Sequence, residues 1–129
     1  MNNNFKNAVK GWLEAIMPSV AATIAAVLTP AALRECAKEE AVHGPYTINI
    51  DELNGPVKAI AFHVVVVNEI AMLAVNATIR NNEEFSSGIK FDMVFSCDGF
   101  VEKIQEDEQL STLVSNLLAQ VEEGYIEEE

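Results

Sequence analysis

The residues best suited to catalysis or metal binding are few. The chain of 129 residues contains two histidines, His43 and His63, and two cysteines, Cys36 and Cys97. Zinc ligands usually recur at short spacings such as Cys-x-x-Cys or His-x-x-x-His, and neither spacing is present. Isolated cysteines are common as small buried apolar side chains, and two lone thiols fit a reducing compartment. The sequence therefore predicts no metal site.

A serine–histidine pair is the remaining catalytic possibility. His63 is expected in one row of a sheet with Ala74 and Ser96, but such a pair also needs an orienting acid and an oxyanion hole. Asp92 has the right strand parity but lies distant along its strand, and no Gly-x-Ser-x-Gly elbow exists. His43 falls where a helix is expected to end, a position in which a cation complements the helix dipole. With no Gly-rich phosphate loop either, we expect no catalytic residue, no cofactor and no enzyme activity.

Acidic side chains are the functional groups that the sequence does concentrate. Acids outnumber bases 20 to 8, giving a net charge of −12. Residues 98–129 hold ten acids against one base, a net charge of −9, whereas the first 38 residues have a net charge of +2. Such a surface repels nucleic-acid phosphates and attracts cationic partners. It also lacks the alternating ligands and central glycine of an EF-hand calcium loop.

The acidic segment suggests two roles. One is a solubilising C-terminus. The other is a binding surface, because residues 102 and 106 and the acidic pair beyond them share one face at helical spacing. The residues expected to make electrostatic contact with a partner are Glu102, Glu106, Asp107, Glu108, Glu122 and Glu123.

The elements that would position these groups begin with two helices. Apolar residues recur every three or four positions from Phe5 to Ile16, which predicts an amphipathic helix that Pro18 ends. A second helix is expected from Ser19 to about Val42, kinked or split at Thr29-Pro30. Residues 15–33 carry no charge and approach the length of a membrane span, but they are rich in alanine and contain two prolines. We expect them to pack under a sheet in a cytoplasmic protein, with membrane association unlikely.

The middle of the chain predicts four strands. Residues 46–50, 57–67, 70–80 and 89–97 are rich in β-branched residues or alternate between apolar and polar positions. Residues 100–106 show no clear period. An apolar stripe from Leu110 to Val121 then indicates a C-terminal helix that ends at Gly124.

The second and third strands predict an apolar surface. If Asn68-Glu69 is a two-residue turn, Val67 pairs with Ile70, residue 65 with residue 72, and His63 with Ala74; an odd-length turn would shift this register. One face then forms the core. The other, which would be polar if it were solvated, carries four apolar side chains near the turn: Val65, Val67, Ile70 and Met72. A second copy, a partner or the protein's own helix would cover them, and we favour a homodimer.

Together these features predict a single α+β domain over residues 1–129. Residues 1–44 would be helical, 45–98 an antiparallel sheet whose core face the helices cover, 99–124 an acidic helical segment and 125–129 an acidic tail. The favoured function is an acidic protein-binding module that mimics nucleic acid and masks a basic, nucleic-acid-binding surface of a partner, as inhibitors and immunity proteins do. The alternatives are a small acidic chaperone that holds a client on its apolar sheet face, and a small-molecule-binding domain.

Overall fold

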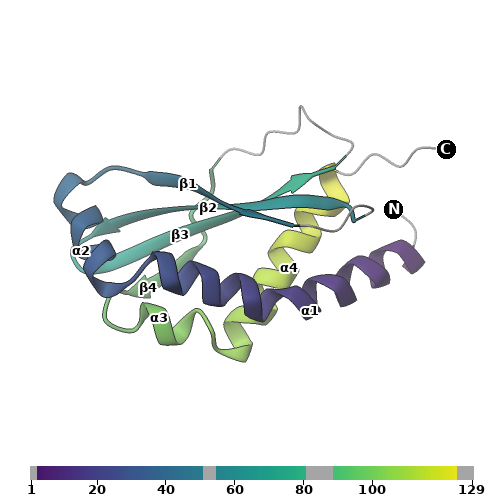
Figure 1. The fold of residues 1–129 in the computed structure, drawn as a ribbon, viewed down its shortest axis with the longest axis horizontal. Helices are drawn as coiled ribbons and strands as arrows, with labels where there is room; N and C mark the ends of the chain where they lie inside the picture. The colour runs from purple at the N-terminus through teal and green to yellow at the C-terminus, as the bar shows by residue number, and fades with distance from the viewer. Residues whose placement is uncertain (1–2, 51–54, 81–88, 125–129) are drawn as a thin grey trace.

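A four-stranded antiparallel sheet with helices packed on one of its faces forms the protein (Figure 1). The computed structural model describes residues 3–50, 55–80 and 89–124. The α+β architecture predicted from the sequence is confirmed. The sheet has the sequential order β1-β2-β3-β4. The elements are α1 (Asn3–Val27), α2 (Pro30–Glu39), β1 (His43–Asn49), β2 (Val57–Val67), β3 (Ile70–Ile79), β4 (Met93–Ser96), α3 (Phe100–Lys103) and α4 (Asp107–Gly124).

The first helix continues through Pro18, so the predicted end at this residue is wrong. A proline inside a helix lacks the N–H that would bond to the Glu14 carbonyl, at a cost of about 3 kcal/mol. However, its ring is exposed, while Met17 before it and Val20 after it are buried. Burying each side chain of this size contributes about 1.5–3 kcal/mol. The packing of the turns after Pro18 therefore outweighs the local penalty.

Replacing Pro18 with alanine is expected to raise the free energy of unfolding by about 1–2 kcal/mol. Alanine restores the missing hydrogen bond and removes the ring from the helix interior. The larger freedom of alanine in the unfolded chain offsets part of the gain. Urea unfolding followed by circular dichroism measures the change. Pro30→Ala is the control, because Pro30 occupies the first turn of α2, where an N–H has no partner within the helix. A Pro18→Ala protein that is no more stable than Pro30→Ala would contradict this account.

The break between α1 and α2 lies at Thr29-Pro30, as predicted. The Thr29 hydroxyl accepts a hydrogen bond from the Ala32 backbone N–H at 3.2 Å and caps α2. The helix ends earlier than expected, because Glu40 takes a left-handed conformation with φ 47°. His43 consequently begins β1 and does not lie in a helical turn.

The uncharged segment from residue 15 to residue 33 is divided between α1 and α2. No single helix in residues 3–50, 55–80 and 89–124 is long and apolar enough to cross a membrane. The two helices satisfy that test by length and composition only when counted together, and they are bent by 62° relative to each other.

The β2–β3 hairpin has the predicted register. Val67 pairs with Ile70, Val65 with Met72, and residue 63 with Ala74. Asn68 and Glu69 both have positive φ angles, 51° and 65°, as a two-residue turn of the tightest hairpin type requires. Because this turn fixes which side chains share a face, the predicted core face is buried along both strands.

β4 is shorter than the predicted strand 89–97 and pairs with β3 only from Met93 to Ser96. Beyond this point the edge of β3 is occupied by a side chain of α4. The Gln120 amide accepts a hydrogen bond from the Ala77 N–H at 2.7 Å and donates one to the Val75 carbonyl at 2.9 Å. Gln120 thus replaces two bonds that a longer β4 would have made.

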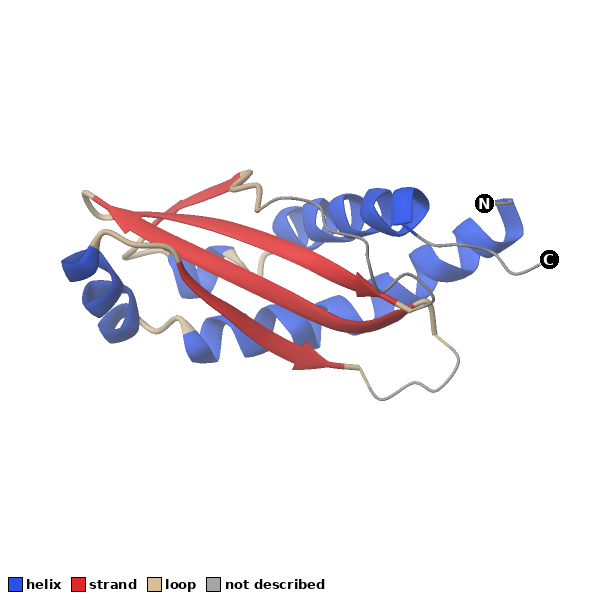
Figure 2. Ribbon diagram, turned by 90° about the horizontal axis from the view of Figure 1, so that it is seen from above, coloured by secondary structure: helices blue, strands red, loops and turns tan. Residues whose placement is uncertain are grey.

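The core lies between the sheet and the helices. Buried apolar side chains of β2, β3, β4 and all four helices form one cluster, and the partly buried Tyr46 and Ile48 of β1 pack against it. No polar or charged residue is buried among the described residues. Figure 2 looks onto the opposite face of the sheet, and no helix crosses in front of the strands. Among the described residues the structure therefore has a helical layer and a sheet layer, and no described helix covers the other face of the sheet, which we call the open face.

Candidate functional site

Four carboxylates gather where α3 passes into α4, and we call Glu102, Glu106, Asp107 and Glu108 the acidic edge. All four residues are exposed. None of them forms an ion pair with another described residue. Lys103 is the one base within this stretch. The acidic edge is therefore a local concentration of charge that the rest of the described chain does not neutralise.

A turn separates the two helices of the acidic edge, so its acids do not share one continuous helical face. The N–H groups of Gln105 and Glu106 bond to carbonyls three residues earlier, at 3.3 and 3.1 Å, which tightens and ends α3. Ile104 is fully buried at this turn and ties it to the core. The acids consequently project from a bend, a broader surface than the predicted stripe.

Two of the six predicted contact residues lie elsewhere. Glu122 and Glu123 are in the last turn of α4, about 21 Å along the helix axis from Glu108 at 1.5 Å per residue. Glu122 forms an ion pair with Lys6 of α1 at 2.9 Å. The structure therefore assembles four of the six acids and places the other two at the far end of the helical layer. The predicted tail, residues 125–129, lies outside the described residues.

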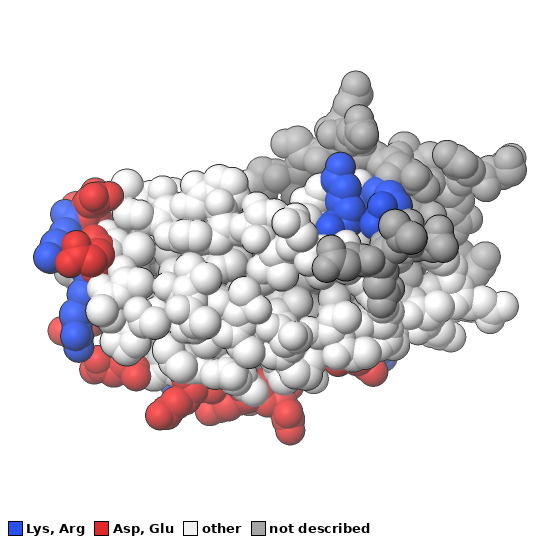
Figure 3. Space-filling view, viewed as in Figure 1, with Lys and Arg blue, Asp and Glu red and all other residues white. Residues whose placement is uncertain are grey.

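The charges are unevenly placed on the surface. Figure 3 shows acidic side chains along the edge where α3 and the start of α4 lie, below the sheet, and mixed charges at the end of the molecule near α2. The broad area between them in this view is uncharged. An uneven distribution of this kind produces a directional electrostatic field, which favours approach of a cationic partner toward the acidic edge.

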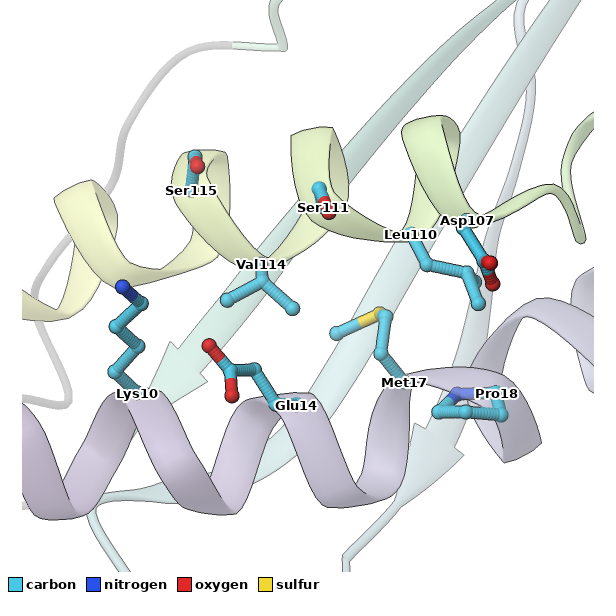
Figure 4. Close-up of a pocket in the computed structure, with 9 residues that line it drawn as sticks. All are labelled: Lys10, Glu14, Met17, Pro18, Asp107, Leu110, Ser111, Val114 and Ser115. Atoms are coloured by element: carbon cyan, nitrogen blue, oxygen red, sulfur yellow. The ribbon is translucent and has the colours of Figure 1, made fainter.

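A cleft between α1 and α4 adjoins the acidic edge. It encloses about 450 Å³. Lys10, Glu14 and Met17 rise from α1 toward α4, and Asp107 points from the start of α4 toward α1 (Figure 4). One cation and two carboxylates above an apolar floor suit a small polar molecule better than an apolar one. The sequence did not indicate this cleft, because Lys10 and Glu14 have the spacing of an ordinary solvated helix face.

The open face of the sheet contains the predicted apolar residues, with differing exposure. Val67 and Ile70 are each 40% exposed, whereas Val65 and Met72 are half-buried. The prediction missed Val94 of β4, which is 60% exposed and pairs beside Met72. The clean alternation of β4 assigns Val94 to the polar side, and only the pairing register shows that it extends the apolar surface.

The histidines and cysteines are not arranged for chemistry. Ser96 pairs with Ile70, whereas His63 pairs with Ala74. The prediction that Ser96 and His63 lie in one row across the sheet is therefore wrong. Residues 63 and 67 of β2 are about 13 Å apart at 3.3 Å per residue, which separates the serine from the imidazole. Burial raises the pKa of both Cys36 and Cys97, which makes these thiols less nucleophilic at neutral pH. Among the described residues no group of three acids, histidines or cysteines is placed to hold a metal ion.

His63 is one of three described residues, with Trp12 and His43, that have a buried side-chain nitrogen without a hydrogen-bond partner. Its Nδ1 atom is buried and has no hydrogen-bond partner among the described residues. The ring lies against Gly44 of β1, since a Cβ built at residue 44 would approach the imidazole to 3.1 Å. Glycine is also needed there because its φ is +124°. The imidazole therefore packs against β1 about midway along β2.

The features with functional potential are thus the acidic edge, the open face and the α1–α4 cleft. The sequence indicates most residues of the acidic edge and the open face, whereas only the fold reveals the α1–α4 cleft. Comparison of the chain with protein-family models, with curated proteins and with solved structures gave no match.

Proposed function

We propose that this protein is an acidic protein-binding module whose acidic edge binds and masks a basic, nucleic-acid-binding surface of a partner protein. The observation that supports the proposal most strongly is the exposure of the four carboxylates at the α3–α4 bend without a neutralising partner in the described chain. Carboxylates arranged this way can occupy positions where a basic groove would otherwise hold phosphates. The protein would then act as an inhibitor or immunity protein.

Helix stability accounts for only part of the acidic edge. Asp107 and Glu108 lie in the first turn of α4, where negative charge favours the N-terminal end of the helix dipole. Glu102 lies in the first turn of the four-residue helix α3. A helix of a single turn has a small dipole, which stabilises this carboxylate only slightly. Helix stability therefore explains little of the exposed charge at Glu102.

The acidic edge is tested by converting its four carboxylates to amides. A fluorescent deca-arginine peptide is the probe, and anisotropy at low salt gives its affinity. Exposed ion pairs contribute about 0.5 kcal/mol each, so four lost pairs lower the affinity by about thirtyfold. Binding of the native protein should also weaken steeply as salt is added, because the interaction is screened.

A matched control removes the same number of charges elsewhere. The control changes four exposed carboxylates, of which two lie in α2, one directly after α2 and one in the β2–β3 turn. The substitutions are Glu35→Gln, Glu39→Gln, Glu40→Gln and Glu69→Gln. The control should lose affinity by only about threefold, through net charge alone. Equal losses in the two variants would show that the acidic edge has no special role.

A further inference from the structure

We propose that two copies of this chain associate through the open face, sheet against sheet, with the helical layers outside. Six large apolar side chains are exposed in the described part of the chain, and three of them, Val67, Ile70 and Val94, lie on this face. They are neighbours at the end of the sheet nearest the β2–β3 turn. Apolar residues concentrated at one exposed site mark an interaction surface.

Few charged residues lie along the strands of the open face: β2 carries one, the exposed Lys58 at the β-bulge between Val57 and Ala59. From Ala59 to Val67 of β2 and from Ile70 to Thr78 of β3, every residue directed to this face is uncharged apart from the titratable His63. The residues beside them are also uncharged: Thr47 and Asn49 in β1, and Val94 and Ser96 in β4. The whole chain carries −12, so two copies repel each other elsewhere. Two copies can meet through the open face without bringing their negative charges close together.

The size of the open face suits a dimer. Ten paired residues of β2 and β3 extend about 33 Å, and about three strands lie side by side at any point, each about 4.8 Å wide. This gives roughly 500 Å² per copy and roughly 1,000 Å² for two copies, which is the lower limit for a specific interface. A small client segment would leave most of this face uncovered, whereas a second sheet covers it completely.

The distribution of side-chain size determines how the two copies fit. The end of the face near the turn carries the large exposed residues Val67 and Ile70, and the other end carries Ala59 and Ala61. A twofold axis that lies between the sheets and runs across the strands places the large residues of each copy over the alanines of the other. His63 lies halfway between Ala59 and Val67, so both imidazoles come near the axis.

Sedimentation equilibrium of the full chain tests this dimer over about 1–100 µM, a range that detects dissociation constants in the micromolar region. The native protein should have twice the mass of the 14.1 kDa chain. Val94→Asp and Ile70→Asp should each raise the dissociation constant by about a hundredfold or more, because each dimer would bury two unpaired carboxylates. Val94 is the more exposed residue, so its variant carries the lower risk of unfolding.

Val42→Asp is the matched control. Val42 is 50% exposed in the connection between α2 and β1, and the substitution adds the same charge away from the open face. It should remain dimeric, and circular dichroism confirms that all variants are folded. A monomeric native protein would overturn the proposal, as would a dimer that survives both open-face substitutions or is lost in Val42→Asp. The result does not depend on the acidic edge, which lies on the opposite, helical side.

Discussion

Replacing Phe100 with alanine is expected to lower the free energy of unfolding by about 3–5 kcal/mol, the range for a large aromatic residue removed from a core. Phe100 is fully buried and meets Phe95 of β4 edge to face, with ring centroids 5.2 Å apart and an interplanar angle of 86°. It is also the one buried residue of the four-residue helix α3. Its loss therefore leaves a cavity and detaches α3 from the sheet.

Val101→Ala provides the comparison, because Val101 is half-buried in the same helix. Its loss of stability should stay near 1 kcal/mol. Chemical denaturation at one fixed protein concentration measures both variants, so that self-association does not affect the comparison. Hydrogen exchange should show the amides of residues 100–106 losing protection in Phe100→Ala. Similar stability losses in the two variants would contradict the role assigned to Phe100.

Replacing Gln120 with leucine is expected to destabilise the protein by about 2–4 kcal/mol. Leucine keeps the size and apolar stem of the side chain, but it leaves the Ala77 N–H and the Val75 carbonyl without their partner. Each partly buried backbone group left unpaired costs about 1–3 kcal/mol. The effect reaches beyond α4, because Gln120 bonds this helix to the edge of β3.

Gln105→Leu is the control for this second experiment. The Gln105 amide donates to the Val101 carbonyl at 2.8 Å, but this bond is local and exposed to solvent. Its removal should change stability by no more than about 0.5 kcal/mol. Thermal unfolding of both variants gives the comparison. A Gln120→Leu protein as stable as Gln105→Leu would show that water satisfies the two backbone groups equally well.

The parts of the fold that the sequence predicted correctly are those that depend on neighbouring residues. The Asn68-Glu69 turn sets the register of β2 and β3, and hence both faces of the hairpin, because a two-residue turn allows only one pairing. The cap at Thr29 was predictable for the same reason, since a hydroxyl followed by proline satisfies the first turn of a helix.

The parts that were predicted incorrectly depend on distant contacts. The local rule that a proline ends a helix predicts an end at Pro18, but the core packing of α1 outweighs this effect and the helix continues. The alternation in residues 89–97 indicates a long strand. The first half of that strand is not formed, because Gln120 bonds to the edge of β3 in its place. Gln120 is more than 40 residues away in sequence from the two residues it bonds. In the candidate site, Glu122 is paired with Lys6 near the other end of the chain, which no local pattern reveals.

The acidic edge and the open face are directed to opposite sides of the protomer. Stacking two sheets through their open faces leaves both helical layers, and therefore both acidic edges, accessible. A dimer of this form could bind two basic surfaces at once, and a divalent partner would be held more strongly than by either edge alone. The two proposals support one another structurally, but each is tested by its own variants.

Affinity capture from cells of the native host tests the central claim most directly, that the acidic edge binds a basic protein. Three full-length baits are compared: the native chain, the variant with amides at the acidic edge and the variant with amides at residues 35, 39, 40 and 69. We expect the native and control baits to retain a basic, nucleic-acid-binding protein that salt releases, and the acidic-edge variant to lose it. Purified native chain should also block binding of nucleic acid by that protein. Equal retention by all three baits, or retention that high salt leaves unchanged, would contradict the account.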